Sequence, residues 1–162
     1  MLLARFWLSL FGVGYLKPGP GTWGSIAATL LWWISLSSLG MVSQLLIFFI
    51  FASASTWICA NFLRESKLGD ESWIVVDEFA AMLFILAFIP RHVFLVLLAL
   101  SMFRLFDIWK PWFVGLVDRK MHGGVGVMLD DFIAALFVLA IILPLVQVVP
   151  EDLIFSEYGL LQ

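Results

Sequence analysis

Ionisable side chains gather in one stretch of the chain, residues 103–132, between two long apolar runs. The stretch holds four of the nine Lys and Arg residues, four of the twelve Asp and Glu residues, and one of the two His residues. Only 13% of the chain is charged and 63% is hydrophobic. This concentration of titratable groups is therefore the first place in which to look for chemistry.

Three residues of the stretch, Arg104, Asp107 and Lys110, recur at intervals of three and share one face of a predicted helix. Arg104 stands about 9 Å before the end of that helix, at about 1.5 Å per residue. An unpaired cation there would be costly in apolar surroundings. The three residues either pair among themselves or find partners on other helices. The available carboxylates are those of Asp77, Glu78, Asp130 and Asp131.

These carboxylates form two adjacent pairs, Asp77-Glu78 and Asp130-Asp131. Neighbouring helical residues point about 100° apart, so we expect one member of each pair to face a common site. The other member would bridge a second ion or orient a base. Oxygen ligands from three helices, without a Cys and His pattern, favour Mg²⁺ over Zn²⁺, and Mg²⁺ in turn favours phosphate oxygens.

A glycine-rich segment, His122-Gly123-Gly124-Val125-Gly126, precedes the last predicted helix. Its glycines would let backbone N–H groups approach an anion, although a plain flexible turn has the same composition. His122 could protonate a leaving alkoxide, bind phosphate, or only cap and pack. Beside Arg119 and Lys120, the segment indicates a phosphate subsite that includes Gly123 and Gly124.

No other nucleophile stands out in the sequence. Cys59 lies in an apolar run, as a small buried hydrophobe would, and no GxSxG motif is present. We therefore expect phosphoryl chemistry by metal-activated water or through an aspartyl-phosphate.

The composition is that of an integral membrane protein. The mean hydropathy is +1.07, and the 162 residues include eight Trp and sixteen Phe. A net charge of −3 argues against nucleic acid as a partner, because phosphate backbones need a basic face. We predict an all-α fold, a polytopic membrane helical bundle with about five membrane segments, in a single domain over 1–162.

The amino-terminal part is predicted to place a short helix in the membrane interface, with Arg5 toward water and Phe6, Trp7 and Leu10 in lipid. Pro and Gly residues in 17–25 predict a turn, after which Thr22 or Ser25 would cap a helix. The apolar run 25–39 has only 15 residues, so it either spans with help from its flanks or is re-entrant.

The other predicted membrane segments are 41–63, 72–89, 92–110 and 128–149. The clean apolar part of the second, 79–89, has 11 residues against the roughly 20 that a span requires. Extending this helix back to Ser72 restores its length and places Asp77 and Glu78 one to two turns inside it.

Alternating crossings bring the ionisable motifs to one end of the bundle. Arg91 stands alone at the other end, and seven basic residues share the motif end: Lys17, Arg64, Lys67, Arg104, Lys110, Arg119 and Lys120. The positive-inside rule then makes the motif end cytoplasmic. An ion-coupled transporter would place polar groups on both sides of the midplane, so this asymmetry favours an enzyme.

Four motifs are spread along most of the length of the chain: PGTWGS at 20–25, IVxDEF at 74–79, FRxxDxWKPW at 103–112 and DRxxHGGxGxMxDD at 118–131. Together they resemble the phosphatidylglycerophosphatase A family. The resemblance implies Mg²⁺-dependent removal of the terminal phosphate of phosphatidylglycerophosphate at the cytoplasmic face of the bacterial inner membrane. Action on another lipid or polyprenyl phosphate, as a phosphatase or phosphotransferase, is the alternative.

The resemblance also implies roles for individual residues. It marks as metal-binding and catalytic acids Asp77, Glu78, Asp107, Asp118, Asp130 and Asp131. It marks as phosphate-facing Arg104, Lys110, Arg119 and His122. The chain departs from the family pattern at 113–115, where Phe-Val-Gly replaces Pro-Ile-Arg and removes a basic residue. Ala81 and Ala135 stand where glycine is common.

Overall fold

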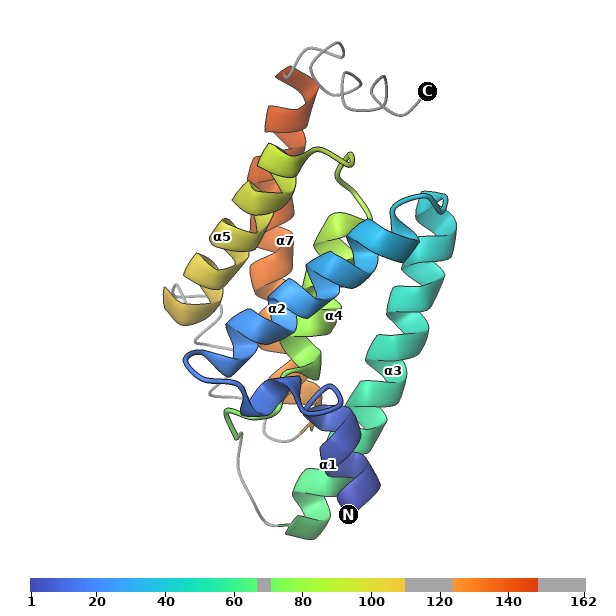
Figure 1. The fold of residues 1–162 in the computed structure, drawn as a ribbon, viewed down its shortest axis with the longest axis vertical. Helices are drawn as coiled ribbons and strands as arrows, with labels where there is room; N and C mark the ends of the chain where they lie inside the picture. Colours follow the sequence, from blue (N-terminus) through green and yellow to red (C-terminus); the bar gives the residue numbers. More distant parts are fainter. Residues whose placement is uncertain (67–70, 110–123, 149–162) are drawn as a thin grey trace.

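The computed structural model describes residues 1–66, 71–109 and 124–148, and every regular element within these ranges is helical. In chain order the elements are α1 (Leu2–Leu8), the 3₁₀ turn η1 (Val13–Tyr15), α2 (Pro20–Leu31), the π-helical η2 (Trp32–Leu36), α3 (Met41–Ser66), α4 (Val76–Leu86), α5 (Val93–Trp109) and α7 (Gly124–Val148). From α2 onward, successive long helices run alternately between the two ends of the bundle (Figure 1). The all-α prediction is confirmed.

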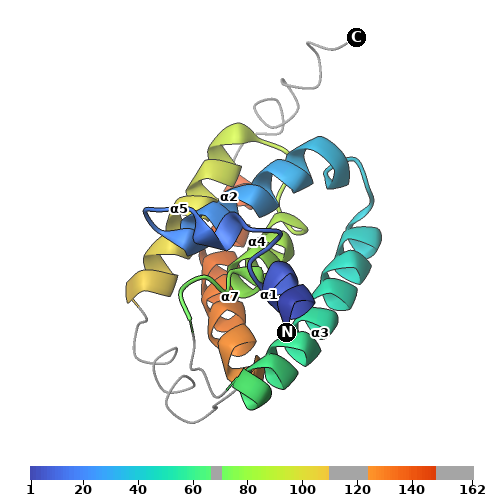
Figure 2. The ribbon, with the colours of Figure 1, turned by 60° about the horizontal axis from the view of Figure 1, so that its bottom comes forward.

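Helix α4 lies at the centre of the bundle, in contact with α2, α3, α5 and α7 (Figures 1 and 2). Every residue from Phe79 to Leu86 is buried. A helix that is apolar all round is stable here because protein surrounds it. The predicted start near Ser72 is wrong, since α4 begins at Val76 and has 11 residues. Asp77 and Glu78 therefore lie in its first turn.

Two helices of the described chain are long and apolar enough to cross a membrane, α3 and the Gly124–Gln147 part of α7. Only 22% and 39% of their most apolar windows are buried inside the protein. Large apolar side chains such as Phe49, Ile50 and Trp57 are exposed on α3, as expected where a helix faces lipid. The predicted number of about five crossings is not established by helix length, because α2, α4 and α5 are shorter.

Helix α2 begins inside the segment that was expected to be a turn. Pro20 occupies its first position, where the missing N–H costs nothing because no intrahelical acceptor is available there. Ser25 does not cap the helix but donates its hydroxyl to the carbonyl of Gly21 at 3.0 Å. A Cβ on Gly24 would stand 3.0 Å from the carbonyl oxygen of Val75. Glycine at this position therefore lets α2 lie close to the start of α4.

The amino-terminal helix α1 packs on α3 through Trp7, whose indole N–H donates to the Ser55 hydroxyl at 3.0 Å. Phe6 is exposed, as predicted, but Leu10 is buried in the core. The placement of Leu10 in lipid is wrong because the chain reverses there, with positive φ at Leu10, Phe11 and Gly12. Arg5 lies over the rings of Phe62 and Trp73, 5.9 Å from each centroid.

The last helix of the described residues, α7, begins at Gly124, four residues before the predicted start at Met128. A Cβ on Gly124 would overlap the backbone nitrogen of Ala60, so this glycine lets α7 pack closely on α3. Asp130 and Asp131 lie in the second turn of α7 as a result.

Candidate active site

A pocket of about 230 Å³ lies where the beginnings of α2, α4 and α7 meet the end of α5. We call it the carboxylate pocket. It is lined by Gly19, Pro20, Gly21, Glu71, Ser72, Ile74, Asp77, Glu78, Arg104, Asp107, Asp130 and Asp131. Both adjacent acidic pairs thus meet Arg104 and Asp107. The 17–25 segment reaches the same end of the bundle, because Gly19 and Gly21 line the pocket. If the apolar run 25–39 were re-entrant, the 17–25 segment would lie at the other end.

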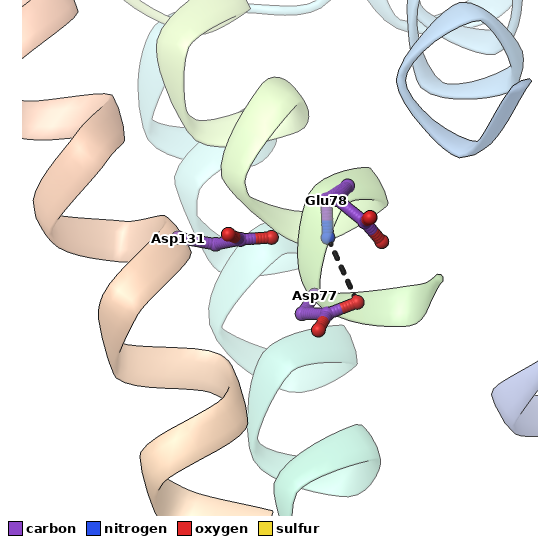
Figure 3. Close-up of side chains that lie close together, drawn as sticks. All are labelled: Asp77, Glu78 and Asp131. Atoms are coloured by element: carbon purple, nitrogen blue, oxygen red, sulfur yellow. Dashed lines mark hydrogen bonds between the residues drawn. The ribbon is translucent and has the colours of Figure 1, made fainter. Parts of the chain in front are cut away.

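Three carboxylates form the centre of the pocket. Oxygen atoms of Asp77, Glu78 and Asp131 all lie within 4.8 Å of one another. Asp131 extends from α7 toward α4, where Asp77 and Glu78 occupy the first turn (Figure 3). Both members of the α4 pair therefore contribute, contrary to the expectation of one per pair.

The two acidic pairs share one local arrangement. Asp77 Oδ1 accepts the backbone N–H of Glu78 at 3.1 Å, and Asp130 Oδ1 accepts that of Asp131, also at 3.1 Å. The second acid of each pair retains a buried oxygen, Glu78 Oε2 or Asp131 Oδ2, with no hydrogen-bond partner in the described part of the chain. Buried carboxylate oxygens without a partner are costly, so this geometry favours a bound cation.

Arg104 connects two helices across the pocket. Its Nη1 lies 2.7 Å from Asp107 Oδ2 on the same helix and 3.6 Å from Glu78 Oε1 on α4. The pairing within the helix and the pairing between helices therefore both occur. Among the described lining residues, Arg104 is the one cation beside six carboxylate side chains. In a poorly solvated pocket such an excess of negative charge attracts a metal ion.

The donor set fits a hard divalent cation. Carboxylate oxygens suit Mg²⁺, Ca²⁺ and Mn²⁺, whereas Zn²⁺ sites are built mainly from Cys and His. Among the described residues, neither Cys59 nor His92 lines the carboxylate pocket. Asp77, Glu78 and Asp131 could therefore hold such an ion.

Gly21 is a site residue that the sequence argument missed. A Cβ there would overlap Glu78 Oε1 and stand 2.9 Å from Arg104 Nη1. Glu71 and Ser72, which come shortly before α4, also line the pocket. Gly21 belongs to the 20–25 motif, which could have indicated a role in the site. The Pro and Gly residues of that segment predicted only a turn.

The family model for phosphatidylglycerophosphatase A matches residues 6–146, a range that contains the whole carboxylate pocket. The chain belongs to this family. It is 36% identical over 133 residues to the phosphatidylglycerophosphatase A of Haemophilus influenzae, with 82% of each chain covered. It is 33% identical over 125 residues to the phosphatidylglycerophosphatase A of Escherichia coli, with 76% of this chain and 72% of that protein covered. No solved structure matches the chain.

Membership of the phosphatidylglycerophosphatase A family confirms the prediction of an enzyme of the phosphatase class. Five predicted site residues lie outside the described residues: Lys110, Asp118, Arg119, His122 and Gly123. Their roles stay predictions. Gly124 does not line the carboxylate pocket and instead packs against Ala60 of α3.

Proposed function

We propose that the chain hydrolyses the terminal phosphomonoester of phosphatidylglycerophosphate, releasing inorganic phosphate and leaving phosphatidylglycerol, as a step of phospholipid biosynthesis. The observation that carries this proposal is the buried cluster of Asp77, Glu78 and Asp131 beside Arg104, in a member of this family. The overall reaction breaks the bond between phosphorus and the glycerol oxygen, and an oxygen from water takes its place.

The proposed cofactor is Mg²⁺, held by Asp77, Glu78 and Asp131, with Asp107, Asp118 and Asp130 as further acids of the site. The unpaired oxygens Glu78 Oε2 and Asp131 Oδ2 support this assignment. A bound Mg²⁺ would polarise the phosphoryl group and offset the charge that develops on it.

Arg104 is proposed to orient the substrate phosphate. Its planar guanidinium group matches phosphate oxygens, and its buried Nε has no hydrogen-bond partner among the described residues. The 2.7 Å contact with Asp107 holds the group in place. On the phosphate side we add Lys110, Arg119, His122 and Gly123, with His122 as the proton donor to the leaving glycerol oxygen.

We place the pocket at the cytoplasmic face of the bacterial inner membrane, so that the lipid stays in the bilayer while its headgroup is cleaved. Support comes from the outward apolar faces of α3 and α7 and from the excess of basic residues that the sequence predicts at the pocket end.

The test is phosphate release by the purified protein from a panel of lipid and polyprenyl phosphates, with and without Mg²⁺. We expect release from phosphatidylglycerophosphate that stops on chelation and returns with Mg²⁺. Release without an added acceptor would distinguish hydrolysis from phosphotransfer. Preference for another lipid phosphate would refute the substrate, and full activity in excess chelator would refute the metal.

A further inference from the structure

A second cavity, of about 250 Å³, lies between α3, α4 and α7 and is almost entirely apolar. Its walls include Phe49 and Ser53 from α3, Ala81 from α4, and Val125 and Leu129 from α7. We call it the α3–α7 groove. Asp77 lines both this groove and the carboxylate pocket. The two cavities therefore meet at one side chain, one cavity being polar and the other apolar.

The groove opens on the surface that the two candidate membrane-crossing helices present outward. Phe49 and Ser53 of α3 are exposed, as is Val125 of α7. A ligand in this position would have its apolar part beside the bilayer and its charged part toward the acidic cluster. That polarity matches a phospholipid, and it matches neither a free phosphate nor a soluble sugar phosphate.

We propose that the α3–α7 groove binds an acyl chain of the phospholipid substrate, and that the phosphate enters the carboxylate pocket past Asp77. This inference rests on the proposed function and assigns the path by which the lipid approaches. Lipid tails are as apolar as the groove, so the hydrophobic effect contributes little to transfer from the bilayer. The groove acts instead by fixing the position of the tail, and with it the position of the phosphate.

The kinetic test fills the groove and compares substrates that differ only in chain length. Ser53→Trp places a large side chain at the exposed edge of the groove, and Ser43→Trp makes the same change ten residues earlier on an exposed part of α3 outside it. For long-chain phosphatidylglycerophosphate we expect Ser53→Trp to lower kcat/KM about tenfold, equivalent to about 1.4 kcal/mol. A short-chain, water-soluble analogue should be hydrolysed at unchanged kcat/KM, and Ser43→Trp should alter neither reaction.

A binding test examines the groove without relying on turnover. Phosphatidylglycerol with a photoactivatable acyl chain, in vesicles, should label peptides of α3 and α7 that line the groove. Ser53→Trp should remove this labelling and Ser43→Trp should not.

Two outcomes would overturn the inference. One is an equal loss on long-chain and short-chain substrates in Ser53→Trp, because that variant would then act on the chemistry. The other is labelling spread over all exposed helix faces and unchanged by Ser53→Trp, which would mean bulk lipid contact only. Groove labelling without phosphate release from any phosphatidylglycerophosphate in the wild type would support the groove and refute the proposed function.

Discussion

The two ends of α4 both lie inside the protein but carry opposite kinds of group. The first turn carries Asp77 and Glu78, which face Asp131 of α7. The last turn carries Ile85 and Leu86, both fully buried in the apolar core that also contains Trp32 and Ile142. At the apolar end every buried side chain packs on others of its kind. At the acidic end carboxylate oxygens remain without hydrogen-bond partners in the described chain.

This difference indicates what each end contributes. Clustered buried carboxylates weaken a fold unless they bind a cation, whereas packed aliphatic side chains stabilise it. Substitutions at the acidic end should therefore reduce activity and leave stability intact, and truncations at the apolar end should do the reverse. Four tests, with five substitutions in all, examine this division.

The largest effect is expected for Asp107→Asn and Asp131→Asn, which remove one charge each and keep the shape of the side chain. Phosphate release should fall by about 10²–10³-fold, the range seen when one group that stabilises transition-state charge is removed. The thermal midpoint of Asp131→Asn in detergent should not fall, because a buried negative charge is lost. Full activity in both variants would refute the assignment of the site.

At the other end of α4, Leu86→Ala should destabilise the fold by about 2–5 kcal/mol, because it leaves a cavity in a packed core. Thermal unfolding and low-temperature phosphate release, measured on the same preparation, would separate stability from activity. Leu97→Ala, at a site 55% exposed on α5, is the matched control and should change stability by less than about 0.5 kcal/mol. If folded Leu86→Ala lost activity, the apolar end of α4 would also be needed for catalysis, which would contradict the proposed difference between the two ends.

The acidic end was the more predictable of the two from sequence. Charged residues stand out in an apolar chain, and alternating helices place the Asp77, Arg104 and Asp131 segments at one end whatever the exact helix boundaries. Arg104 needed an acid from another helix, and Glu78 supplies it at 3.6 Å.

Other features could not be read from local patterns. Hydropathy does not distinguish a helix surrounded by protein from one surrounded by lipid, so α4 was expected to be longer than it is. The glycines at the start of α7 predicted a loop, yet Gly124 is the first residue of the helix. Glycine is suited to this position because a Cβ there would overlap the backbone of Ala60 on α3. The role of Gly21 depends entirely on neighbours from α4 and α5, which no pattern within 17–25 contains.

Gly21→Ala tests whether the acidic end depends on close packing as the apolar end does. The added Cβ would overlap the Glu78 carboxylate, which must then move. A displacement of about 1 Å in a catalytic group can cost about 10²-fold, and we expect a loss of that order in kcat. Gly40→Ala is the matched control, because a Cβ there meets nothing within 4 Å. Equal activity in the two variants would show that the position of Glu78 is not critical.

Arg104→Lys should give the smallest of the four effects, because it keeps the charge and changes only how that charge is held. Nη1 of Arg104 contacts both Asp107 and Glu78, whereas Lys presents a point charge on a flexible stem and lacks the planar guanidinium group that matches phosphate oxygens. Loss of one charge-assisted hydrogen bond to the substrate phosphate costs about 1.5–3 kcal/mol, and the lower figure corresponds to a fall in kcat/KM of about tenfold. Arg91→Lys makes the same change at the opposite end of the bundle, where Arg91 stacks on Trp33 at 4.8 Å, and should leave kcat/KM unchanged. If both variants lost activity equally, the substitution would be acting through general stability, and the functional difference between the two ends would not hold for cations.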